Sequence, residues 1–99
     1  MAEPKITREE LAGGRGRYVA RIDGIDAEAE LVFSRDGPKL IIAEHTEVPD
    51  VFRGKGMGRL LAARMVEDAR RDGVKIHALC TFVNAERQKH PDWADVFQT

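Results

Sequence analysis

A glycine-rich run between an apolar segment and a helical one most constrains what this chain can fold into. Residues 53–58 read Arg-Gly-Lys-Gly-Met-Gly, directly before the helical pattern that begins Arg59-Leu60-Leu61. Upstream, the apolar residues 40–43 predict a buried strand. Because glycine has no Cβ, the backbone can adopt a positive φ and an anion can approach it closely. The N–H groups of a helix N-terminus attract the same anion. The run therefore predicts a strand, a turn and a helix start that together bind a diphosphate.

Two common phosphate-binding motifs do not fit this run. A Walker A loop requires Ser or Thr after its Gly-Lys pair, whereas Lys55 is followed by Gly56. In the dinucleotide fingerprint G-x-G-x-x-G, counted from Gly54, the third glycine would stand where Arg59 is. The pattern that remains is Arg-x-x-Gly-x-Gly. The alternative interpretation is a glycine-rich turn that binds nothing.

Length and composition limit the remaining possibilities. A chain of 99 residues predicts one domain, residues 1–99, that is a monomer or a weak homodimer. The net charge of −1 provides no basic field for nucleic acid. No signal peptide is recognisable, and no apolar run approaches the roughly 20 residues that span a bilayer, so no membrane partner is expected. The single Cys80 excludes an internal disulfide and a Cys-x-x-Cys metal site, which favours a reducing cytoplasm and no metal.

Alternation of apolar and polar residues predicts four strands. They are expected at residues 18–23, 27–33, 39–48 and 74–82. The first three are joined by connections too short for a crossover, so they should form an antiparallel meander. A helix is predicted from Met57 to Asp72, with Gly73 just beyond its end. The last strand returns after this helix and should run parallel to the third.

The two ends of the chain have weaker patterns. Residues 1–16 are polar and broken by Pro and Gly, which is compatible with a flexible N-terminal segment. Within it, residues 6–11 predict one helical turn with Thr7 as its cap. A short helix is predicted over residues 84–90, and a final turn over residues 92–97. The fold class is α/β with a mixed sheet.

The loop and the element order resemble the GNAT superfamily of acetyl-CoA-dependent N-acetyltransferases. The pattern Arg-x-x-Gly-x-Gly of residues 53–58 is similar to the pyrophosphate loop of that superfamily. Val48-Pro49 before the loop, Cys80, and His90-Pro91-Asp92-Trp93 resemble a subgroup of chains of about this length. The resemblance covers residues 18–97. It implies a GNAT-like core of a three-strand antiparallel meander, the CoA-loop helix, a parallel strand and a short C-terminal helix.

The same resemblance implies where acetyl-CoA would bind. The backbone of the loop would hold its phosphates, and the residues concerned are Arg53, Gly54, Lys55, Gly56, Met57 and Gly58. The Val48 N–H would hold the thioester oxygen at the end of the third strand. Asn84 would lie close to the pantetheine arm, although its type also suits an ordinary N-cap.

Acetyl transfer to an amine requires a base, a donor to the oxygen, and help for the departing sulfur. His45 is the candidate base, because imidazole titrates near neutral pH. The alternative is that His45 is an ordinary polar residue at a strand end. Strand alternation places His45 and Glu47 on one face, and Glu44 and Thr46 on the other. Cys80 could be a buried apolar residue, a proton donor to the CoA sulfur or a nucleophile, with His45 the histidine expected near it. We expect direct attack by the amine.

Two departures from the resemblance leave the acceptor and the activity open. The helical pair that usually covers the substrate is absent, and the chain's only tyrosine, Tyr18, is not where the family carries one. An open acceptor site favours peptide or protein lysines. The alternative is a non-catalytic module that binds or senses acyl-CoA. A third interpretation, nucleic-acid binding through Arg53, Lys55 and Arg59, is disfavoured by balanced charge and few aromatic residues.

Overall fold

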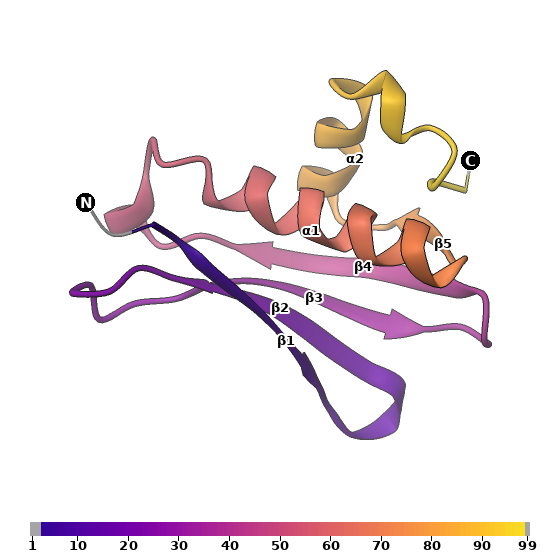
Figure 1. Ribbon diagram of the computed structural model, residues 1–99, viewed down its shortest axis with the longest axis horizontal. Helices are drawn as coiled ribbons and strands as arrows, with labels where there is room; N and C mark the ends of the chain where they lie inside the picture. Colours follow the sequence, from indigo (N-terminus) through magenta and orange to yellow (C-terminus); the bar gives the residue numbers. More distant parts are fainter. Residues whose placement is uncertain (1–2, 99) are drawn as a thin grey trace.

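The computed structural model describes residues 3–98 and shows a five-stranded sheet with both α-helices packed on one face (Figure 1). The elements are β1 (Lys5–Glu10), β2 (Arg15–Arg21), β3 (Ala29–Arg35), β4 (Leu40–Glu47), α1 (Met57–Asp72), β5 (Lys75–Ala78) and α2 (Thr81–Gln88), with short 3₁₀ turns at Ala12–Gly14, Asp50–Phe52 and Pro91–Trp93. The strand order is β1-β2-β3-β4-β5. Strands β1 to β4 are antiparallel, and β5 is parallel to β4. The expected mixed α/β fold is confirmed.

The N-terminal segment differs from its prediction. Residues 6–11 were expected to form a helical turn, but residues 5–10 form β1, which pairs with β2 in the register Ile6↔Ala20 and Arg8↔Tyr18. The meander therefore has four strands rather than three. Pairing with β2 supplies a ladder of backbone hydrogen bonds that outweighs a local capping signal. Residues 1–2 of the predicted flexible segment lie outside the described residues.

The helix after the glycine run is confirmed with the predicted bounds. Helix α1 covers Met57–Asp72, and Gly73 follows it at φ 71° with its N–H bonded to the Ala69 carbonyl. Its apolar side is buried against the face of the sheet that the helices cover, called the inner face below. The core includes Leu31, Phe33, Ala43, Leu61, Ala62, Met65, Val66 and Ile76. This packing holds the N-terminus of α1 at the carboxyl end of β4.

The predicted fourth strand is shorter than expected. Strand β5 ends at Ala78 rather than at residue 82, because the N–H groups of Leu79 and Cys80 both donate to the Ala43 carbonyl, at 3.1 and 2.9 Å. Helix α2 then begins at Thr81, with Cys80 as its N-cap residue. Cys80 therefore lies in a strand-to-helix link, and the predicted helix over residues 84–90 begins three residues earlier.

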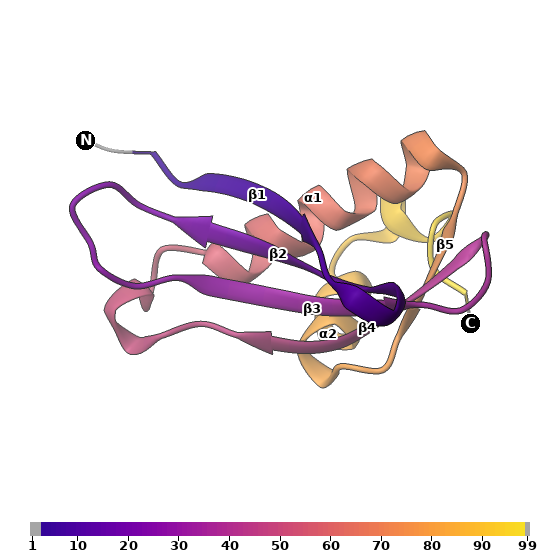
Figure 2. The same ribbon diagram turned by 90° about the horizontal axis from the view of Figure 1, so that it is seen from below.

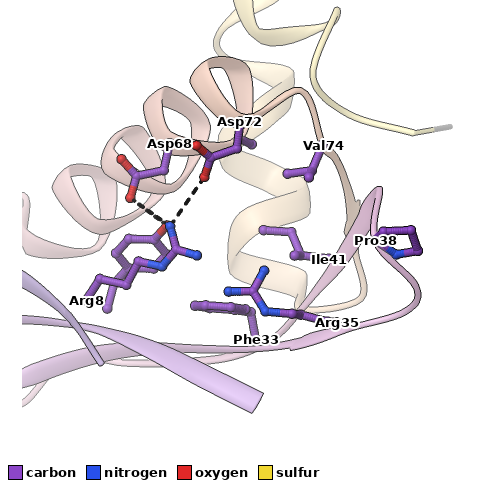
Figure 3. Close-up of a pocket in the computed structure, with 10 residues that line it drawn as sticks. Arg8, Phe33, Arg35, Pro38, Ile41, Asp68, Asp72 and Val74 are labelled. Atoms are coloured by element: carbon purple, nitrogen blue, oxygen red, sulfur yellow. Dashed lines mark hydrogen bonds and ion pairs between the residues drawn. The ribbon is translucent and has the colours of Figure 1, made fainter. Parts of the chain in front are cut away.

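An ionic network joins β1, β2 and the C-terminal half of α1. The Asp68 carboxylate is 3% exposed and accepts a hydrogen bond from the Tyr18 hydroxyl at 2.9 Å. Guanidinium groups of Arg8, Arg64 and Arg71 lie 3.3–3.6 Å from it. Burial and the bond to Asp68 raise the pKa of the Tyr18 phenol. Arg8, Tyr18 and Asp68 border a cavity of about 210 Å³, in which Arg8 faces Asp68 and Asp72 (Figure 3).

Replacing Asp68 with alanine should destabilise the fold by about 3–5 kcal/mol, because the change leaves a buried hydroxyl unsatisfied and removes the carboxylate that the arginines share. Urea unfolding followed by circular dichroism measures this. Asp36→Ala, in an exposed turn, is the control and should change stability by less than about 0.5 kcal/mol. Equal effects of the two substitutions would contradict a special role for Asp68.

The face of the sheet away from the helices carries a second ionic cluster around Arg17. Its guanidinium donates to Glu9, Glu28 and Glu30 at 2.9–3.0 Å. The hydrogen bond from Arg17, with a further one from Arg21, lowers the pKa of Glu28 below its ordinary value of 4.5. A carboxyl group with a lowered folded-state pKa contributes stability above its unfolded pKa, and this contribution disappears as pH falls through the folded one.

Arg17→Met should therefore destabilise the protein at pH 7 by about 1 kcal/mol, the scale of partly exposed ion pairs. The difference from the unmodified protein should shrink as pH falls below about 4, because the carboxylates then become protonated in both proteins. Thermal unfolding at pH 7 and at pH 3.5 tests this. A difference that stays constant with pH would show that Arg17 acts by packing alone.

Candidate functional site

The glycine loop lies between the end of β4 and the start of α1, and its backbone is left-handed at two glycines. Gly54 has φ 80°, and Gly56, the N-cap residue of α1, has φ 67°. A Cβ built on Gly54 would meet no atom within 4 Å, and one on Gly56 would meet only the Arg59 guanidinium at 3.8 Å. The two glycines therefore face open space, which a bound anion could fill.

Most backbone N–H groups of this loop and of the first turn of α1 have no hydrogen-bond acceptor in the protein. The N–H of Lys55 bonds to the Phe52 carbonyl at 3.0 Å, and no side chain caps the helix. Within residues 3–98, the N–H groups of Gly54, Gly56, Met57 and Gly58 have no hydrogen-bond acceptor. Such orphan donors attract phosphate oxygens, and the helix dipole adds to the attraction. The loop thus has the donors and the space that a diphosphate needs.

The third glycine of the motif also serves the packing of the two helices. A Cβ on Gly58 would lie 2.5 Å from the Phe82 ring of α2, so its small size permits close packing between the two helices. Met57 is buried in the core, so its side chain anchors the first turn of α1 while its backbone stays at the loop. Arg53 is exposed and pairs with Asp50 at 3.1 Å.

Strands β4 and β5 are paired only over part of β4. Their register runs from Leu40↔Lys75 to Ala43↔Ala78, but β4 continues to Glu47. Within residues 3–98, the last residues of β4 therefore have no β5 partner, and this unpaired edge of β4 is called the gap below. Val48 follows β4, is half-buried, and its N–H has no acceptor within residues 3–98. This N–H is available to an oxygen atom in the gap.

A β-bulge in β4 decides which side chains point to which face. Val32 of β3 pairs with His45, whereas its neighbour Phe33 pairs with Ala43, so Glu44 is an additional residue in β4. Glu44 bonds to Ser34 at 2.9 Å on the outer face, the face that the helices leave uncovered (Figure 2).

The expected grouping of Glu44 with Thr46 is therefore wrong. Beyond the bulge, Thr46 pairs with the buried Leu31 and so shares the inner face. His45 and Glu47 share the outer face, as expected from strand alternation, and Glu44 joins them there.

The bulge separates the two main catalytic candidates. His45 is 59% exposed on the outer face, with its Nε2 3.9 Å from Glu47 Oε1. Cys80 instead contacts Thr46 across the gap, with Sγ 3.4 Å from the Thr46 hydroxyl. The histidine expected near Cys80 thus lies on the opposite face of β4. Thr46 was not singled out in the sequence, because neither alternation nor composition signals a bulge.

Asn84 lies inside α2 rather than at its start. Its N–H bonds to the Cys80 carbonyl at 3.0 Å, and its side-chain oxygen accepts a hydrogen bond from Arg87 at 2.8 Å. Asn84 is therefore not an N-cap, and its side chain is engaged within α2. In the part of the chain that the structure describes, no cluster of three or more His, Cys, Asp or Glu residues could hold a metal ion. No helix among the described residues is long and apolar enough to cross a membrane.

Comparison with known proteins gives a consistent picture. A family model described as GCN5-related N-acetyl-transferase matches residues 17–96. The chain is 30% identical to Protein NATD1 of Xenopus tropicalis over 77 residues, which are 78% of this chain and 71% of that protein. It is 27% identical to Protein NATD1 of Homo sapiens over 77 residues, with 78% and 68% covered.

Two solved structures are similar to this one. The NMR structure of a GCN5-like protein from Staphylococcus aureus has a TM-score of 0.70 and 28% identity, and 95% of this chain and 87% of that one are covered. The crystal structure of nourseothricin acetyltransferase has a TM-score of 0.58 and 22% identity, with 93% and 67% covered. At that identity the second likeness concerns the fold alone.

Proposed function

The chain belongs to the GCN5-related N-acetyltransferase family, and on this premise we propose that it transfers the acetyl group of acetyl-CoA to an amine by direct attack. One observation carries the proposal: the N-terminus of α1 is uncapped and presents unbonded N–H groups beside two left-handed glycines. The loop backbone would hold the phosphates, with Arg53 and Lys55 near them. Asn84 would face the pantetheine arm.

The proposed division of chemical roles follows the two faces of β4. His45, on the outer face, takes a proton from the acceptor ammonium, because only the neutral amine has a lone pair for attack. The Val48 N–H donates to the thioester oxygen as negative charge develops there. The new N–C bond forms as the C–S bond breaks, the departing sulfur takes the proton of Cys80, and the second proton of the attacking nitrogen passes to solvent.

This arrangement favours direct transfer over a covalent acetyl-cysteine. A nucleophilic Cys80 needs a neighbouring base to activate it. The neighbour of Cys80 in the structure is the Thr46 hydroxyl, and His45 lies on the other face of β4. His45 is thus better placed to serve an acceptor on the outer face than to activate Cys80.

The acceptor that suits this site is a lysine side chain of a peptide or protein. Within residues 3–98, neither α-helix covers the outer face of the sheet (Figure 2), which is the face on which His45 lies. Glu47 lies on that face with its Oε1 3.9 Å from His45 Nε2, which favours a cationic group over an anionic one. For the whole chain, 1–99, we propose a single domain that acts as a monomer or weak homodimer. The free thiol of Cys80 agrees with a cytoplasmic location.

The second candidate is a module that binds acyl-CoA without turning it over. One observation favours it: Tyr18, the only tyrosine, is 1% exposed and bonded to Asp68. It therefore cannot protonate the CoA sulfur. In this interpretation the loop binds the ligand in the same way, but no acetyl group moves.

Two measurements test these proposals in sequence. Titration calorimetry with acetyl-CoA should show binding at micromolar to millimolar concentration, and no heat at millimolar ligand would overturn both candidates. Release of free CoA thiol is then followed with a panel of lysine peptides and small amines. Turnover above the rate of spontaneous hydrolysis supports the transferase. Binding without turnover on any amine supports the binding module instead.

A further inference from the structure

We infer that Thr46 is a positioning residue that holds the thiol of Cys80 in the gap between β4 and β5. The observation is the contact of 3.4 Å between the Thr46 hydroxyl and the Cys80 sulfur, in which either atom can donate. The inference rests on the proposed function, because it gives Cys80 its partner in that reaction. Neither the loop motif nor the family match singles out Thr46.

The backbone around this contact is fixed from two sides. The Cys80 N–H donates to the Ala43 carbonyl of β4 at 2.9 Å, and the Cys80 carbonyl accepts the Asn84 N–H of α2 at 3.0 Å. Rotation about χ1 is then the main freedom that the thiol retains. Thr46 is β-branched, so its own χ1 is restricted and its hydroxyl has a defined direction. A hydrogen bond between the two side chains removes the remaining freedom of the sulfur.

The bulge at Glu44 brings Thr46 to this contact. In a regular strand, alternation from the buried Ala43 would place His45 and Glu47 on the inner face. The additional residue turns Thr46 inward instead, opposite Leu31. A hydroxyl beside the core costs free energy unless it is hydrogen-bonded. Within residues 3–98, Cys80 is the hydrogen-bond partner of that hydroxyl.

The hydroxyl can follow the charge of the sulfur during the reaction. When the thioester C–S bond breaks, its electron pair remains on the CoA sulfur, which takes the proton of Cys80. The Cys80 sulfur is then anionic, and the Thr46 hydroxyl, which keeps its own proton, donates a hydrogen bond to it. Solvent restores the Cys80 proton afterwards. Valine has almost the same shape as threonine but cannot donate this bond.

The test compares Thr46→Val, which removes the hydroxyl, with Thr46→Ser, which retains it. Thr7→Val, on the exposed part of β1, is the matched control. The first readout is the rate at which iodoacetamide alkylates Cys80, measured on the intact protein by mass. This readout needs neither acetyl-CoA nor turnover, and the product is unambiguous because Cys80 is the chain's only cysteine.

The expected result is that alkylation slows about fivefold in Thr46→Val, the scale of one lost hydrogen bond, and returns to within about twofold in Thr46→Ser. In the transferase assay, Thr46→Val should lower kcat by a similar factor while the Kd for acetyl-CoA stays unchanged. Unchanged alkylation in Thr46→Val, or an equal loss in Thr46→Ser, would overturn the inference. If alkylation changes as expected but the protein acetylates no amine, the role of Thr46 in positioning Cys80 is supported and the proposed function is contradicted.

Discussion

Replacing Gly56 with valine is expected to weaken acetyl-CoA binding by about 100-fold or more. Gly56 has φ 67°, a backbone conformation that a β-branched residue adopts only with strain. The added side chain would also project into the open space in front of the loop, where the phosphates are proposed to lie. Both effects act on the same N–H groups, because relief of the strain would turn them away from the ligand. Titration calorimetry measures the loss.

Gly37→Val is the control for this substitution. Gly37 also has a left-handed backbone, with φ 81°, and a Cβ there would meet no atom within 4 Å. It lies in the turn between β3 and β4, at the opposite end of β4 from the loop. It should therefore cost similar folding stability while acetyl-CoA binding is retained. Normal binding by Gly56→Val would show that the ligand does not use this loop, and equal losses in both variants would point to a general loss of folding.

His45→Gln should lower kcat about 100-fold or more, the usual effect of removing a general base. Glutamine approximates the size and polarity of histidine but cannot accept a proton at neutral pH. Because His45 lies on the outer face, away from the glycine loop, the Kd for acetyl-CoA should change by less than about twofold. Steady-state release of CoA thiol with a lysine peptide measures kcat, and calorimetry measures the Kd.

His77→Gln is the matched control for His45→Gln. His77 is exposed on β5, and its register partner on β4 is Ile42. It carries the same chemical group on the neighbouring strand but lies where β4 and β5 are still paired. This variant should keep its activity. Full activity in His45→Gln would assign the base to another group or to solvent, and equal loss in both histidine variants would argue for a shared electrostatic effect rather than a base.

The glycine loop and α1 could be predicted from the sequence because local interactions determine both. The periodicity of apolar residues and the glycine at each end set the bounds of α1, and the structure has the predicted ones. The positive φ values of Gly54 and Gly56 follow from the same local pattern. The parallel return of β5 also follows, because a strand that comes back after a helix crosses over with one handedness.

Other features depend on the tertiary structure alone, because the residues concerned contact distant parts of the chain. Strand β1 exists because β2 offers it a partner, whereas its own sequence fits a capped helical turn equally well. The need for glycine at position 58 comes from the Phe82 ring of a later helix. Strand β1 pairs with β2 across as many as 16 positions, and Gly58 meets a residue 24 positions away, so no local pattern in the sequence records these contacts.

The bulge at Glu44 shows the same limit at the candidate site. The identity of the residues in β4 sets which chemical groups are present there, namely a histidine, a threonine and two glutamates. The alignment of β4 with β3 sets the face on which each group lies, and one additional residue exchanges the two faces. The sequence therefore determined the chemistry that the strand can offer. Pairing with β3 decided that Thr46, and not His45, lies against Cys80, because register depends on hydrogen bonds between strands rather than on either strand alone.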